Sequence, residues 1–199
     1  EIALTKGIAS SIQSIINEDS KTEQQADTAI FYSINNCQHG LKRVPLGNFL
    51  IKIVVTELAM ELPSIKKYST LSPIPGFANW LKKEIASDGE FLTDHDKEVF
   101  KLLEDDRWYQ NSIKSKKLKK PLIKACARYL LLEKKYGKPI NAVARFHFGN
   151  GAKLFRINWM GNTSEYGIDK SFGLMVNYVY NLKKIEAKNK LESSVYGMK

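Results

Sequence analysis

The segment from residue 28 to residue 71 constrains the fold of this chain most, because its pattern changes twice between strand and helix. Thr28 to Ile34 is β-branched and aromatic, which is typical of a buried strand. Phe49 to Leu62 is long and strongly apolar, and its spacing of three and four residues predicts a buried helix. Tyr68 to Leu71 reads as another strand. Strands interleaved with helices indicate an α/β (α+β) sheet domain.

The rest of the chain continues this alternation. Strands are predicted over 2–5, 154–159 and 174–182, and helices over 10–16, 77–85, 93–103 and 141–148. Residues 111–120 are polar and rich in lysine, and Pro121 is expected to start a helix that runs to about Lys135 and is ended by Gly137 and Pro139. The block at about 77–136 therefore reads as a helical insertion.

Composition narrows the class of protein. The 199 residues fit one domain, and 43% hydrophobic residues are enough for a core. The formal net charge of +10 favours an anionic partner, which can be nucleic acid, an anionic membrane or a phosphorylated ligand. No apolar run approaches the length of a membrane span, and no secretory signal opens the chain.

Cysteine and histidine give no sign of a metal centre. Cys37 and Cys126 lie far apart, and neither they nor the three histidines show the spacing of metal ligands. We read the cysteines as free thiols in a reducing compartment, with a disulfide left open as the alternative. No metal site is predicted.

The loop before the apolar helix has the features of an anion site. The first backbone N–H groups of a helix lack partners within the helix, and together with the helix dipole they attract anions. Gly47 permits close backbone approach, and Lys42 and Arg43 add positive charge, so a pyrophosphate would fit. The alternative is an ordinary surface loop, and no P-loop motif is present.

Two motifs are highly specific when found together: Ser72-Pro73-Ile74-Pro75-Gly76-Phe77 and Phe146-His147-Phe148-Gly149-Asn150-Gly151-Ala152. Further distinctive stretches are residues 29–34, 46–52, 156–160 and 173–178. In their order and approximate spacing, from about Ile2 to Leu182, these motifs resemble the malonyl-CoA decarboxylase family.

The resemblance implies a fold related to the GNAT acetyltransferases: a mixed sheet that binds acyl-CoA and is flanked by helices. Residues 1–199 would then be a single catalytic domain, a fragment without the family's N-terminal helical oligomerisation domain. A homo-oligomer is expected for the full-length protein, at an intracellular location for which cytoplasm, mitochondrion and peroxisome are not distinguishable.

The resemblance also implies the site. Ser72 and His147 would be the catalytic pair, and Tyr180 a further active-site residue. The segment implied to bind CoA comprises Lys42, Arg43, Val44, Leu46, Gly47 and Asn48. One departure is Pro45, which stands where the family often has an acidic residue, so the role of that carboxylate does not carry over.

The implied reaction suits these residue types. Loss of CO2 from malonyl-CoA leaves an enolate of acetyl-CoA, which needs hydrogen-bond donors at its oxygen and a proton for its carbon, and no metal or organic cofactor. A histidine can supply the proton near neutral pH, and a serine hydroxyl can be its partner. The alternatives are an acyltransferase of the same fold, a nucleic-acid-binding module and an inactive fragment; no nucleic-acid-binding motif supports the second.

Overall fold

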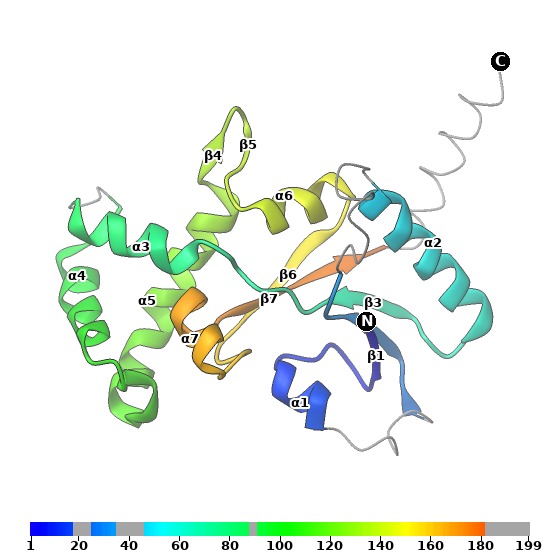
Figure 1. Cartoon of the computed structure of the whole chain (residues 1–199), viewed down its shortest axis with the longest axis horizontal. Helices are drawn as coiled ribbons and strands as arrows, with labels where there is room; N and C mark the ends of the chain where they lie inside the picture. The colour runs from blue at the N-terminus through cyan, green and yellow to red at the C-terminus, as the bar shows by residue number, and fades with distance from the viewer. Residues whose placement is uncertain (18–24, 35–45, 88–90, 182–199) are drawn as a thin grey trace. The chain divides into compact units, whose positions relative to one another are not determined.

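A five-stranded mixed sheet organises the chain in the order β1-β2-β3-β7-β6 (Figure 1). The strands are β1 (Ile2–Thr5), β2 (Thr28–Phe31), β3 (Lys67–Thr70), β6 (Lys153–Asn158) and β7 (Met175–Tyr180). β1 is antiparallel to β2, β2 is parallel to β3, and β3 is antiparallel to β7. This computed structural model describes residues 1–17, 25–34, 46–87 and 91–181. The predicted mixed sheet flanked by helices is confirmed.

The described residues fall into two compact units. The sheet unit comprises 1–72, 146–156 and the residues from 176, and the helical unit comprises 73–145 and 157–175. The predictions of a single catalytic domain over 1–199 and of an insertion at about 77–136 stay predictions.

In the sheet unit, α2 (Leu46–Glu61) connects the parallel strands β2 and β3. A parallel pair needs such a crossover, because a tight turn cannot join two parallel strands. Ile51 and Val55 on α2 are buried, as are Ala29 and Ile30 on β2, so the predicted buried helix and strand are confirmed. The strand is shorter than predicted, because it ends at Phe31. α1 (Ile12–Asn17) follows β1.

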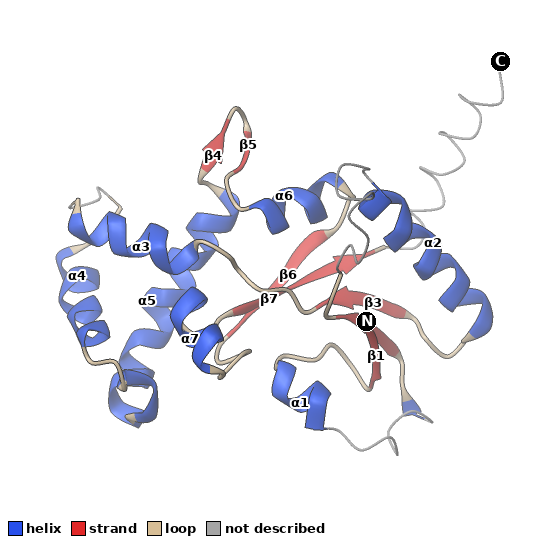
Figure 2. Ribbon diagram, viewed as in Figure 1, coloured by secondary structure: helices blue, strands red, loops and turns tan. Residues whose placement is uncertain are grey.

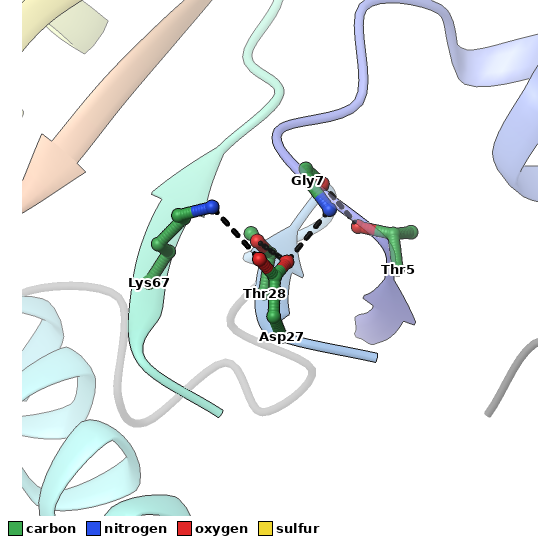
Figure 3. Close-up of polar contacts among 5 residues, drawn as sticks. All are labelled: Thr5, Gly7, Asp27, Thr28 and Lys67. Carbon is green, nitrogen blue, oxygen red and sulfur yellow. Dashed lines mark hydrogen bonds and ion pairs between the residues drawn. The ribbon is translucent and has the colours of Figure 1, made fainter. Parts of the chain in front are cut away.

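Asp27 ties together the ends of three strands (Figure 3). Its carboxylate accepts hydrogen bonds from the Gly7 N–H at 2.7 Å, the Thr28 hydroxyl at 2.6 Å and the Lys67 ammonium at 2.7 Å. The hydrogen bond from Lys67, followed by those from Thr28 and Gly7, holds the pKa of Asp27 well below its ordinary value of 3.8. The ionised carboxylate therefore stabilises the junction of β1, β2 and β3.

Replacing Asp27 by asparagine is expected to lower the free energy of unfolding by about 1 kcal/mol, because both side chains of the ion pair are partly exposed and solvent screens the charge. Since the folded pKa is lowered, this stability is present above about pH 4 and is lost as the pH falls below it. Urea unfolding at pH 7 and pH 3 measures both effects. Asp169→Asn, which removes an exposed pair with the adjacent Lys170, is the control and should change little. Equal losses in the two variants would contradict the role of Asp27.

The helical unit is built mainly from helices and 3-10 turns (Figure 2). Its elements include α3 (Phe77–Ala86), α4 (Asp94–Phe100), η3 (Lys101–Glu104), η4 (Trp108–Gln110), α5 (Ser112–Leu131) and α7 (Glu165–Ser171). The Phe77 ring packs against Tyr129 at 5.7 Å and edge-on against Phe172 at 5.9 Å between ring centroids. Thr93 caps α4 through a capping box with Asp96.

Two boundary predictions in this unit are wrong. α5 begins at Ser112, because the Asn111 side chain caps the helix by accepting hydrogen bonds from the N–H groups of Ile113 and Lys114. Pro121 therefore lies inside the helix and does not start it. The helix ends at Leu131, and β4 (Lys134–Lys135) and β5 (Lys138–Pro139) form a hairpin after it. Its turn residues, Tyr136 and Gly137, both have positive φ, which matches the twist of a hairpin. The cap at Asn111 and the tight turn at residues 136–137 thus set the ends of α5, and Pro121 and Pro139 do not.

Candidate active site

Ser72 is brought into place by an interruption of the ladder between β3 and β7. The strands pair at Ser69 and Val179, and again at the bridge of Ser72 with Val176. Between these two points, hydrogen bonds that involve side chains take the place of backbone hydrogen bonds between the strands. The Thr70 hydroxyl accepts the Tyr178 N–H at 3.1 Å, and the Asn177 amide donates to the Thr70 carbonyl at 2.7 Å.

The same interruption gives Ser72 its first partner. The Ser72 hydroxyl donates to Thr70 Oγ1 at 2.9 Å, and both side chains are buried. No local pattern in the sequence marks Thr70, because its contact with Ser72 depends on how the two strands pair. The hydroxyl of Ser72 is therefore held from one side by its own strand.

His147 lies in the last turn of α6 (Ala142–Gly149) and reaches Ser72 from another part of the chain. Its Nε2 is 3.3 Å from Ser72 Oγ, and its Nδ1 is 2.7 Å from the Tyr180 hydroxyl. The imidazole also stacks on the Tyr178 ring, with 4.5 Å between centroids. The structure thus brings together all three residues that the sequence predicted as catalytic.

Burial sets the electrostatics of this group. His147 is only 3% exposed, and desolvation lowers its pKa from 6.5 to about 4, so the imidazole is neutral at pH 7. Burial raises the pKa of Tyr180, and the Asn150 amide beside its hydroxyl opposes that rise. Tyr180 therefore stays protonated at neutral pH.

The direction of these hydrogen bonds depends on which nitrogen of His147 carries the proton. With Ser72 donating to Thr70, a proton on Nε2 lets His147 donate to Ser72, and Nδ1 then accepts a hydrogen bond from the Tyr180 hydroxyl. The result is a continuous chain from Tyr180 through His147 and Ser72 to Thr70. Such a chain can position a substrate oxygen and move a proton without a charged histidine in the free site.

The predicted CoA-binding residues lie at the edge of what the structure describes. Lys42, Arg43 and Val44, together with Pro45, lie outside the described residues. Leu46, Gly47 and Asn48 form the start of α2. Their assignment to CoA stays a prediction.

Within 1–17, 25–34, 46–87 and 91–181, no cluster of three or more His, Cys, Asp or Glu residues has the arrangement of a metal site. The described helices include none with the length and apolar character needed to cross a membrane. Cys126 is a buried free thiol, whereas Cys37 lies outside the described residues. The absence of a cofactor stays a prediction.

A cavity of about 510 Å³ lies in the helical unit. Its lining includes Lys82, Arg107, Trp108 and Asp169. None of the three predicted catalytic residues belongs to it. Its mixed charges do not indicate a ligand class.

Comparison with known proteins agrees with this geometry. A family model described as the malonyl-CoA decarboxylase C-terminal domain matches residues 1–194. This chain belongs to the malonyl-CoA decarboxylase family. The mitochondrial malonyl-CoA decarboxylase of Anser anser anser is 43% identical over 205 residues, which cover 92% of this chain and 41% of that protein. The corresponding protein of Rattus norvegicus is 42% identical over 92% of this chain and 42% of its own length.

Solved structures give the same family and the expected fold. The crystal structure of malonyl-CoA decarboxylase from Rhodopseudomonas palustris matches with a TM-score of 0.87 and 42% identity, covering 94% of this chain and 44% of that one. The loading GNATL domain of CurA from Lyngbya majuscula matches with a TM-score of 0.55 and 10% identity, over 92% and 69% of the two chains. The second match concerns the fold alone and confirms the GNAT-like prediction. The chain thus spans less than half the length of its malonyl-CoA decarboxylase relatives.

Proposed function

We propose that this member of the malonyl-CoA decarboxylase family converts malonyl-CoA to acetyl-CoA and CO2. The observation that carries the proposal is the hydrogen-bonded chain of Ser72, His147 and Tyr180, in a chain about 40% identical to proteins named for that activity. We propose that these three residues act on the malonyl group. The start of α2, with Lys42 and Arg43 before it, is our proposed site for the phosphates of CoA.

The neutral state of His147 supports decarboxylation. A carboxylate leaves as CO2 only when its negative charge moves into the thioester, so a strong ion pair with the carboxylate would stabilise the ground state and slow the reaction. A buried, uncharged imidazole avoids that ion pair. The apolar neighbours of the ring, among them Phe146 and Tyr178, further reduce hydration around it.

The overall reaction consumes one proton, which ends on the carbon that lost CO2. The negative charge that develops on the enolate as CO2 leaves raises the pKa of a nearby imidazole, because an opposite charge favours the protonated form. His147 can therefore take up a proton as the enolate forms and deliver it to the enolate carbon. Ser72 is placed to donate to a substrate oxygen once it turns from Thr70. We propose that no metal or organic cofactor takes part, because hydrogen-bond donors are sufficient for an enolate.

We also propose an intracellular location. The relatives from goose and rat are named as mitochondrial, and a buried free thiol at Cys126 fits a reducing compartment. The homo-oligomer of the full-length protein and the absence of nucleic-acid binding stay predictions.

Incubation of the purified chain with malonyl-CoA and no acyl acceptor tests the proposal. We expect acetyl-CoA and CO2 in equal amounts, and a loss of at least about tenfold in turnover for Ser72→Ala, which removes one hydrogen-bonding group. Ser87→Ala, at the exposed end of α3, is the matched control and should keep wild-type turnover. Acyl transfer only when an amine is added, with no CO2 release, would instead identify an acyltransferase.

A further inference from the structure

Asn150 is a buried polar residue to which the proposed mechanism gives no role so far. It follows α6 directly and is only 5% exposed, yet its Nδ2 atom has no partner with hydrogen-bond geometry among the described residues. Most buried polar atoms in proteins are paired, because an unpaired buried donor is destabilising. An unpaired amide in the core therefore needs an explanation.

The local backbone does not need this amide. The Asn150 N–H already donates to the carbonyls of Phe146 and His147, at 3.1 and 3.2 Å, and the Ala152 N–H donates to the His147 carbonyl at 3.0 Å. The end of α6 is thus closed by backbone hydrogen bonds. A side-chain role in capping is excluded for the Nδ2 atom.

A second buried asparagine shows what a structural amide looks like in this chain. Asn141 Nδ2 donates to the Pro75 carbonyl at 2.9 Å, and its Oδ1 accepts the Ala144 N–H at 2.8 Å. Both ends of that amide are used, and it fixes the start of α6. Asn150 differs because its Nδ2 atom, the donor of the amide, makes no hydrogen bond with the described residues.

The position of Asn150 indicates where the missing partner lies. Its amide is close enough to the Tyr180 hydroxyl to oppose the rise of that group's pKa, although the contact does not reach hydrogen-bond geometry, and the hydroxyl is itself bonded to Nδ1 of His147. The amide therefore belongs to the same buried polar group as the predicted catalytic residues. A substrate oxygen that enters this group would meet a donor without a well-formed hydrogen bond in the protein.

We infer that Asn150 Nδ2 donates a hydrogen bond to the thioester oxygen of malonyl-CoA and so makes Asn150 a further catalytic residue; this rests on the proposed function. We choose the thioester oxygen over the carboxylate as the acceptor, because negative charge builds up on the thioester oxygen and leaves the carboxylate during decarboxylation. A donor accelerates the reaction only where its hydrogen bond strengthens in the transition state.

The test is Asn150→Leu, which replaces the amide by an apolar group of similar size. We expect kcat to fall about a hundredfold, which is typical for the loss of one oxyanion donor, with KM for malonyl-CoA nearly unchanged. We also expect the melting temperature to change little, because the lost donor made no well-formed hydrogen bond in the protein. Asn141→Leu is the matched control and should lower the melting temperature.

The outcomes separate this inference from the proposed function. Wild-type kcat in Asn150→Leu, or a fall in melting temperature as large as that of Asn141→Leu, overturns the role of Asn150 while decarboxylation by the unaltered chain stands. No CO2 release by the unaltered chain overturns the proposed function, and calorimetric titration with malonyl-CoA then decides about Asn150. The variant for this titration is Asn150→Asp, because its carboxylate would repel the thioester oxygen. Weaker binding of malonyl-CoA by the variant supports a contact between Asn150 and that oxygen. Equal affinity of the two proteins for malonyl-CoA counts against the contact.

Discussion

Replacing His147 by asparagine is expected to lower the turnover of malonyl-CoA by at least about 10²-fold, and by up to about 10⁴-fold, the usual range for a general acid–base group. The imidazole is the only side chain that contacts both Ser72 and Tyr180 in the described hydrogen bonds. Asparagine can keep one of these contacts but cannot carry the proton. The loss should appear in kcat, because the proton is needed after the substrate has bound.

His95→Asn provides the matched control for this measurement. His95 lies on the exposed surface of α4, in the helical unit, and makes none of the hydrogen bonds described for the site. We expect this variant to keep wild-type turnover. Circular dichroism of both variants checks that they fold. Wild-type turnover in a folded His147→Asn variant would remove His147 from the mechanism and leave the family assignment intact.

The sequence predicted the elements of the sheet well, because their signals are local. Apolar spacing is enough to distinguish α2 from β2, and alternation with turn residues marks the strands. The errors around Pro121 and Gly137 have a physical cause as well. A proline is tolerated inside α5 when packing and the Asn111 cap outweigh one missing hydrogen bond, and no local pattern reveals that balance.

The candidate site was predicted for a different reason. Ser72 and His147 were named from motifs of a family, since a lone serine before a proline and a lone histidine at a helix end have common structural roles. Their meeting depends on contacts between residues 75 positions apart. Thr70 and Asn150 were missed because their roles arise from the interrupted ladder and from an unpaired amide, which exist only in the folded chain.

The buried imidazole also predicts an unusual dependence of stability on pH. The pKa of His147 is about 4 in the folded chain and 6.5 in the unfolded chain, so between these values the unfolded chain binds more protons. Stability must therefore fall as the pH is lowered through this window. The shift corresponds to a loss of about 3 kcal/mol between pH 7.5 and pH 4.

Urea unfolding at pH 7.5, 5.5 and 4 measures this loss, and His147→Asn isolates its source. Among the described residues, His147 makes its hydrogen bonds and ring contacts with Ser72, Tyr180 and aromatic side chains, and none of these partners is a carboxylate that could offset a charge on the ring. The lowered pKa values of Asp27 and Asp96 act only below about pH 4, which separates their effect from that of the imidazole. We expect the variant to lose most of the slope between pH 6.5 and pH 4. The same slope in both proteins would mean that the imidazole is hydrated in solution and has an ordinary pKa. That result would remove the buried, uncharged imidazole of the free site on which the proposed decarboxylation depends.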